Sequence, residues 1–213
     1  MDRKEALALF EHRFVPATAP APPLALLLLH GTGGDESDLL PLGPLLARGA
    51  ALLSPRGRVL ESGMPRWFRR IAEGVFDVED LKRRTGELVT FLGAAREAYG
   101  LTGVPLVAVG FSNGANIAGG TLLVEPGALE GAILLRAMVP FEPAAPPALA
   151  GKPVFVGAGR FDPLVRPDES ERWAAMLREY GADVTLHWSQ IGHALSQEDV
   201  TAARGWLAER FGA

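Results

Sequence analysis

Short runs of apolar residues alternate along the chain with longer stretches in which apolar positions recur at helical spacing. The most uniform runs are Leu24–Leu29 and Leu106–Val109, whose composition is typical of strands buried on both faces of a sheet. Glu11–Val15 alternates polar and apolar residues before the proline- and alanine-rich connector Pro16–Pro23, which favours an edge strand followed by a turn. Further short strands are expected at Ala50–Ser54, Gly131–Leu135, Pro153–Ala158 and Val184–Ser189.

The stretches between these runs carry helical patterns. Asp77–Tyr99 has apolar residues at helical spacing with charges between them, which predicts a long amphipathic helix. A shorter helix capped by Ser37 or Asp38 is expected to run to about Arg48, and a helix capped by Ser196 follows the last strand. Strands and helices that alternate in this way predict an α/β fold with a mostly parallel sheet and helices on both faces. Functional side chains should then gather at the carboxyl ends of the strands.

The segment Gly110–Gly114, which reads Gly-Phe-Ser-Asn-Gly, joins the strand at Leu106–Val109 to a further helical pattern. It matches the Gly-x-Ser-x-Gly nucleophile elbow, in which a sharp turn holds the serine in a strained backbone conformation at the end of a strand. The flanking glycines let the strand and the helix approach each other. A plain glycine-rich turn is the alternative, since a five-residue pattern also arises by chance. The strand and the helix around the pattern favour Ser112 as a nucleophile.

A second glycine-rich loop, His30–Glu36, follows the apolar run Leu24–Leu29. It lacks the lysine of a phosphate-binding P-loop and the glycine spacing of a dinucleotide site. In α/β hydrolases a loop in this place supplies one backbone N–H of the oxyanion hole, and the residue after the nucleophile supplies the second. Thr32 and Asn113 are therefore the expected oxyanion-hole donors, while His30 is expected to brace the loop.

Two later residues can complete a catalytic triad. Asp162 follows the penultimate strand, and His193 lies in the loop after the last one. Asp-Pro is a common turn pair, so the position of Asp162 alone favours a structural role. The order Ser112, Asp162, His193 is nevertheless the nucleophile, acid and histidine order of α/β hydrolases. Asp168 and Asp183 are the alternative acids, although neither directly follows a strand.

Between Pro55 and Val75 the regular pattern breaks down, because prolines and glycines interrupt it repeatedly. An irregular stretch of this length in a compact domain is usually either functional or disordered. Its aromatic residues Trp67 and Phe68 have two interpretations of equal weight. They form either an ordered wall over the active site or a plug in the core.

Composition excludes several classes of function. The 213 residues with 48% hydrophobic content suffice for one sizeable core, which favours a single domain spanning residues 1–213. The 21 basic and 25 acidic side chains give a net charge of -4, without a basic run that could follow a nucleic-acid backbone. Cysteine is absent, so disulfides, thiolate metal sites and cysteine nucleophiles are excluded. No apolar run approaches the length of a membrane span and the N-terminus lacks the features of a signal peptide, so we expect a cytoplasmic protein.

These motifs and the layout of nearly the whole chain resemble the phospholipase/carboxylesterase family of α/β hydrolases, which includes the acyl-protein thioesterases, and within it the small bacterial carboxylesterases. The segments that carry the resemblance are His30–Glu36, Pro55–Gly57, Met64–Phe68, Gly110–Gly114, Gly159–Asp162 and Gly192-His193. The resemblance implies a single-domain α/β-hydrolase fold without a large cap domain. It also implies the triad and the oxyanion donors named above, no metal or other cofactor, and in many members a homodimer.

The function expected from these features is hydrolysis of small to medium carboxylic esters through an acyl-enzyme on Ser112. Without an inserted cap the cleft should be shallow, and short acyl chains should be favoured. The expected lining of the cleft is apolar and consists of Trp67, Phe68, Met138, Phe141, Leu164 and Leu195. An acyl-thioesterase or a lysophospholipase would use the same triad, and a non-catalytic binding protein with a hydrolase fold is the alternative of another class.

Overall fold

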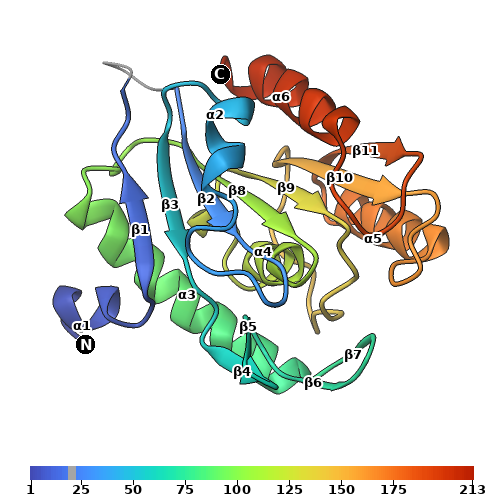
Figure 1. Cartoon of the computed structure of the whole chain (residues 1–213), viewed down its shortest axis with the longest axis horizontal. Helices are drawn as coiled ribbons and strands as arrows, with labels where there is room; N and C mark the ends of the chain where they lie inside the picture. The colour runs from blue at the N-terminus through green and yellow to red at the C-terminus, as the bar shows by residue number, and fades with distance from the viewer. Residues whose placement is uncertain (19–22) are drawn as a thin grey trace.

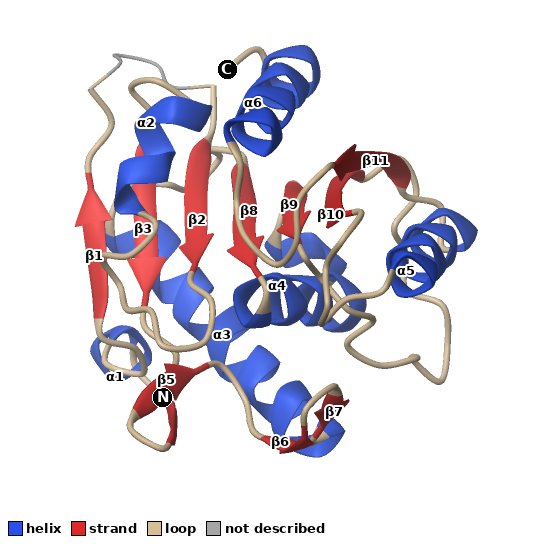
Figure 2. Cartoon of the chain, turned by 45° about the vertical axis from the view of Figure 1, so that its right-hand side comes forward, coloured by secondary structure: helices blue, strands red, loops and turns tan. Residues whose placement is uncertain are grey.

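In the computed structural model, which describes residues 1–18 and 23–213, seven strands form one sheet in the order β1-β3-β2-β8-β9-β10-β11. These strands are β1 (His12–Val15), β2 (Ala25–Leu29), β3 (Ala51–Pro55), β8 (Leu106–Phe111), β9 (Gly131–Leu135), β10 (Pro153–Gly159) and β11 (Asp183–Ser189). The edge strand β1 pairs antiparallel with β3, whereas the other pairs in this sheet are parallel. Figure 2 shows β1 pointing opposite to its neighbours. The mostly parallel sheet predicted from the sequence is confirmed.

The buried strands send alternate side chains to opposite faces of the sheet. In β2, Leu27 and Leu29 join one apolar cluster, whereas Leu26 and Leu28 join the other. Both faces are covered, and this explains why the strand is apolar at every position instead of alternating with polar residues.

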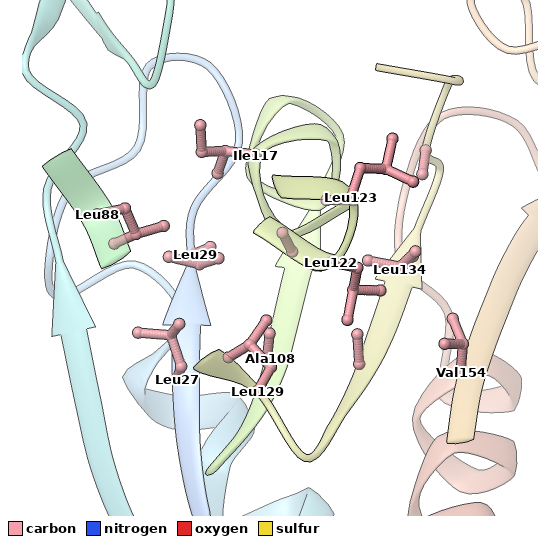
Figure 3. Close-up of a cluster of buried hydrophobic side chains, with 14 of the residues drawn as sticks. Leu27, Leu29, Leu88, Ala108, Ile117, Leu122, Leu123, Leu129, Leu134 and Val154 are labelled. Carbon is pink, nitrogen blue, oxygen red and sulfur yellow. The ribbon is translucent and has the colours of Figure 1, made fainter. Parts of the chain in front are cut away.

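Helices cover both faces of the sheet, as predicted (Figure 1). One face packs against α3 (Val78–Ala98), α4 (Asn113–Val124) and α5 (Pro167–Glu179). The opposite face packs against α2 (Gly43–Leu46) and α6 (Gln197–Phe211). Figure 3 shows Leu88 of α3 and Ile117 of α4 on the first face, close to Leu29 of β2. The short helix α1 (Arg3–Leu7) lies beside α3.

The helix expected from Ser37 or Asp38 to about Arg48 is wrong in its start and its extent. The structure has a 3₁₀-helix, η1 (Leu40–Leu42), followed directly by the single-turn helix α2, and neither begins at a side-chain cap. Each piece has a proline in its first turn. Proline has no N–H to donate and its ring clashes with the preceding turn, so one continuous helix cannot form here.

The irregular segment between β3 and α3 contains two small antiparallel hairpins. They consist of β4 (Val59–Glu61) with β5 (Met64–Arg66), and β6 (Arg70–Ala72) with β7 (Val75–Phe76). Figure 2 shows them beyond the end of the sheet to which the arrowheads of β2, β3 and β8 point. The segment therefore lies at the carboxyl ends of the parallel strands, where functional side chains gather.

The other predicted elements agree with the structure to within a residue or two. Asp77 caps α3, and Ser196 caps α6 through a capping box with Asp199. The sequence prediction missed α1 and α5, while part of the predicted connector Pro16–Pro23 lies at 19–22, outside the described residues. A short η2 helix (Pro126–Ala128) follows α4. Across the described ranges, no helix combines the length and the apolar character that crossing a membrane requires.

Candidate active site

Ser112 lies at the turn between β8 and α4 with φ 52° and ψ −115°. A positive φ is strained for a residue that carries a side chain. The turn requires glycine on both sides, because a Cβ at Gly110 would lie 2.5 Å from the carbonyl oxygen of Gly114. A Cβ at Gly114 would lie only 1.9 Å from the carbonyl oxygen of Leu29. The N–H of Ser112 donates to the carbonyl oxygen of Leu135 at 2.8 Å, so the neighbouring strand fixes the turn.

Two hydrogen bonds join Ser112 to His193 and Asp162. Nε2 of His193 lies 2.8 Å from Oγ of Ser112, and Nδ1 lies 2.8 Å from Oδ2 of Asp162. The other carboxylate oxygen, Oδ1, accepts from the N–H groups of Leu164 and Val165 at 2.8 and 2.9 Å. The Asp162 side chain is fully buried, whereas that of His193 is 16% exposed. With this geometry the imidazole can take the serine proton while the carboxylate holds its tautomer with the proton on Nδ1.

The two alternative acids lie elsewhere. Asp168, in the first turn of α5, pairs with Arg166 at 2.8 Å, and its side chain is 66% exposed. Asp183, at the start of β11, pairs with Arg210 at 2.7 Å. Of the three acids considered from the sequence, the structure brings only Asp162 to His193.

Thr32 and Asn113 both line the cavity that opens at Ser112. Asn113 is the first residue of α4, so its N–H has no acceptor within the helix. The loop that carries Thr32 is held in place by β5, because the N–H of Gly33 donates to the carbonyl oxygen of Pro65 at 2.9 Å. Backbone N–H groups fixed in this way beside a nucleophile can stabilise a developing oxyanion without rearrangement.

Trp67 lies behind this loop and does not line the cavity. Its side chain is 1% exposed, and its Nε1–H donates to the carbonyl oxygen of His30 at 2.9 Å. Its backbone N–H donates to Oδ1 of Asn113 at 2.8 Å, so Trp67 ties the loop to the elbow. Phe68 is fully buried and contacts Phe76 edge-on, with ring centroids 5.1 Å apart. Both aromatic residues therefore belong to the core, which corrects their expected place in the cleft.

The cavity has a volume of about 240 Å³. Of the other expected lining residues it contains Met138 and Leu164, but not Phe141 or Leu195. Phe141 is buried in the core against α3 and α4, and Leu195 packs against the cluster beneath α6. The apolar residues that the sequence analysis missed are Phe76, Phe111 and Val165.

Five polar residues of the cavity were also missed: Arg66, Arg70, Glu73, Asn116 and Arg136. Asn116 lies one helical turn after Ser112, so its spacing along α4 could have placed it on the same face. Its Oδ1 accepts from the N–H of Met138 at 2.9 Å, which fixes the side chain in the cavity wall. The arginines come from the hairpin segment and from the end of β9, where no local pattern marks them as inward-facing.

Residues 11–210 match the family model described as Phospholipase/Carboxylesterase. The chain belongs to the phospholipase/carboxylesterase family. It is 49% identical over 184 residues to MhqD of Bacillus subtilis (strain 168), covering 86% of this chain and 92% of MhqD. Among solved structures it is similar to a Bacillus cereus carboxylesterase, with TM-score 0.90 and 43% identity over 98% of this chain and 99% of that one. A carboxylesterase from Mesorhizobium loti gives TM-score 0.88 and 31% identity over 94% and 95% of the two chains.

These comparisons confirm the family and the α/β-hydrolase fold inferred from the sequence.

In this member of the phospholipase/carboxylesterase family, a buried arginine supports the loop that carries the histidine. Arg136 directly follows β9, has φ 58°, and its side chain is fully buried. Its Nε donates to the carbonyl oxygen of Gly192 at 3.2 Å, and its guanidinium pairs with Asp199 of α6 at 2.7 Å. Arg136 thus joins Gly192, the residue before His193, to α6 and to the end of β9.

His30 fixes the base of the loop His30–Glu36 in this family member. Its Nε2 accepts from the N–H of Gly57 at 2.9 Å, so Nε2 carries no proton, and Nδ1 donates to the carbonyl oxygen of Gly31 at 2.6 Å. Burial lowers the pKa of His30 below its ordinary value of 6.5, although the bond to Gly31 and nearby acids oppose this. Protonation would also remove the acceptor on which Gly57 depends.

The unfolding free energy should therefore fall as the pH is lowered from 7 to 5. In this range His30 binds a proton more readily in the unfolded chain than in the folded chain, where its pKa is lower. The stabilising contribution of His30 is therefore present at neutral pH and is lost in acid. His30→Gln keeps a donor and an acceptor but does not titrate. Urea unfolding of both proteins at pH 7 and pH 5 tests this, and the stability advantage of wild type over His30→Gln should narrow at pH 5. A constant or growing advantage would contradict the prediction.

Proposed function

We propose that this chain is a serine carboxylesterase that hydrolyses small to medium carboxylic esters through an acyl-enzyme. The observation that carries the proposal is the hydrogen-bonded series Ser112, His193 and Asp162 at the opening of a cavity. Membership of the phospholipase/carboxylesterase family supports hydrolase chemistry, and the similarity to the Bacillus cereus carboxylesterase supports an ester as the substrate.

The reaction begins when Oγ of Ser112 attacks the ester carbonyl and Nε2 of His193 accepts the hydroxyl proton. The carbonyl oxygen becomes an oxyanion facing the N–H groups of Thr32 and Asn113. His193 then gives its proton to the leaving alkoxide as the C–O bond breaks, which leaves an acyl-Ser112 ester. Water repeats the sequence on this ester, releasing the acid and restoring the hydroxyl. Asp162 remains ionised throughout and stabilises the imidazolium.

The size of the cavity favours a small substrate. Its volume of about 240 Å³ falls below the range of roughly 300–1,000 Å³ typical of pockets for drug-sized ligands. A long acyl chain would extend beyond it across the protein surface. The apolar residues Phe76, Met138 and Leu164 suit a short alkyl segment.

A series of p-nitrophenyl esters of increasing acyl length tests the proposal, with Ser112→Ala assayed beside the wild type. We expect kcat/KM to peak at short chains and the mutant to be inactive. A clear preference for long chains would contradict the size argument. A faster reaction with an acyl-thioester than with the oxygen ester of the same acid would favour the acyl-thioesterase. If no ester is hydrolysed and a fluorophosphonate fails to label Ser112, the chain is a binding protein with a hydrolase fold.

A further inference from the structure

The cavity contains a buried arginine that the proposed reaction does not use. Arg66, the last residue of β5, is 4% exposed and lines the cavity. Its Nη1 donates to Oγ1 of Thr32 at 3.0 Å, and its Nε donates to the carbonyl oxygen of Phe68 at 3.4 Å. Within residues 1–18 and 23–213, its Nη2 donates to no acceptor. Within the described residues, this buried guanidinium therefore keeps its Nη2 donors free for a ligand in the cavity that Arg66 lines.

The charge of Arg66 is only partly balanced. Its Nε lies 3.2 Å from Oε2 of Glu61, but Oε1 of the same carboxylate lies 2.8 Å from Nη2 of Arg70, which also lines the cavity. Neither arginine pairs with another acid in the described part of the chain. Two guanidinium groups thus share one carboxylate, which leaves a net charge of about +1 on the three side chains at neutral pH.

Burial makes the unbalanced positive charge of Arg66 energetically costly. Burial lowers the pKa of Arg66, and the nearby charge of Arg70 adds to the effect, whereas Glu61 opposes it. A buried cation without a full counter-charge is destabilising, and an anion bound beside it relieves that penalty. Glu73 is the other acid on the cavity rim, but it is exposed at the β6–β7 turn, where water screens its charge.

We propose that Arg66 and Arg70 form a subsite for a carboxylate group of the substrate, so that the preferred esters are half-esters of small dicarboxylic acids. The inference rests on the proposed esterase function and specifies its substrate class. A guanidinium fork binds a carboxylate through two parallel hydrogen bonds. Arg66 contacts Thr32, which also carries a proposed oxyanion donor, so the second acid group lies a short spacer away from the ester carbonyl. Ser112 cleaves the ester bond as before, and the bound carboxylate takes no part in bond making.

Two matched substrates and one inhibitor test the subsite. Monomethyl succinate carries the free carboxylate, dimethyl succinate lacks it, and succinate itself should compete with the neutral substrate p-nitrophenyl acetate. We expect wild type to favour the monoester by about tenfold or more in kcat/KM, as one charge-assisted hydrogen bond allows. Hydrolysis of the neutral ester p-nitrophenyl acetate tests the esterase activity independently of the carboxylate subsite. If Ser112-dependent hydrolysis of this ester persists while the monoester has no advantage, the subsite is wrong and the esterase stands.

Three variants of the subsite should change the inhibition constant of succinate, two of them upwards and one downwards. Arg66→Lys keeps the charge but loses the fork, and Arg70→Gln loses the charge, so each should raise the inhibition constant of succinate by about tenfold. Glu61→Gln removes the competing carboxylate and should lower it severalfold, a gain that misfolding cannot produce. Arg204→Gln, an exposed position on α6, makes the same change of net charge as Arg70→Gln and should leave succinate inhibition unchanged.

Binding can also be measured without catalysis. Titration of succinate into Ser112→Ala by calorimetry should give a dissociation constant that Arg66→Lys weakens and Glu61→Gln tightens in the same background. If succinate binds none of these proteins, or if Arg66→Lys lowers kcat equally for neutral and acidic esters, Arg66 does not serve a carboxylate and the subsite is rejected. If succinate binds but the monoester has no advantage over the diester, the assignment of substrate class is overturned.

Discussion

Replacement of Ser112 by alanine should lower kcat for a p-nitrophenyl ester by about 10⁴–10⁶-fold, as in other enzymes whose serine and histidine act as a unit. The variant keeps the proposed oxyanion donors Thr32 and Asn113 and the cavity that they line, so KM and the overall fold should change little. Without Oγ, Nε2 of His193 has no hydroxyl from which to take a proton, and no acyl-enzyme can form. Steady-state kinetics and mass spectrometry after fluorophosphonate treatment measure both consequences, with one adduct expected on wild type and none on the variant.

Ser62→Ala is a matched control for this change. Ser62 has the same φ of 52° as Ser112, but it lies exposed at the turn between β4 and β5. The two variants therefore make the same side-chain replacement at positions that share the same positive φ. Ser62→Ala should retain full activity. Residual activity in Ser112→Ala within tenfold of wild type would mean that another group is the nucleophile.

The sheet and the Ser112 series could be predicted because local sequence determines them. Leu24–Leu29 is apolar throughout and must be buried on both faces, and Gly110–Gly114 permits a turn that other residues would block. Asp162 and His193 each follow a strand, and the carboxyl ends of parallel strands meet at one edge of the sheet. Their proximity therefore follows from topology without any knowledge of side-chain packing.

The walls of the cavity could not be predicted in the same way. Trp67 and Phe68 are adjacent to Arg66, yet the two aromatic residues enter the core while the arginine lines the cavity. Which of these residues faces the cavity depends on how the β4–β5 hairpin docks against the loop His30–Glu36, through contacts such as that of Trp67 with His30. Such contacts join residues far apart in sequence, and no local periodicity reports them.

Arg136 was missed for a different reason. A charged residue at the end of a strand is expected to point into water. A positive φ is usually signalled in the sequence by glycine, and here the residue with φ 58° is an arginine. Its burial depends on Asp199, 63 residues later in the chain. Asp199 also accepts from the hydroxyl and the N–H of Ser196, so the sequence identifies it only as part of a helix cap.

Replacement of Arg136 by methionine should reduce the unfolding free energy by about 3–5 kcal/mol, the usual cost of removing one partner of a buried ion pair. Both side chains of the pair are at most 1% exposed, so the variant would leave the Asp199 carboxylate buried without its counter-ion. Urea unfolding measures the loss. Arg166→Met removes the exposed pair with Asp168 and should change stability by less than about 1 kcal/mol. Equal effects of the two replacements would contradict the role assigned to Arg136.

The pH dependence of this loss identifies its cause. In wild type, burial on its own would raise the pKa of Asp199, but hydrogen bonds from Arg136 and Ser196 outweigh it and hold the pKa below its ordinary value. The stabilisation is therefore present above the unfolded pKa and lost as the pH falls through the lower folded value. In Arg136→Met burial is no longer opposed by the guanidinium, so the carboxyl should protonate more readily in the folded chain than in the unfolded one. The destabilisation of the variant should then be largest at neutral pH and shrink in acid, whereas a loss caused by packing alone would not vary with pH.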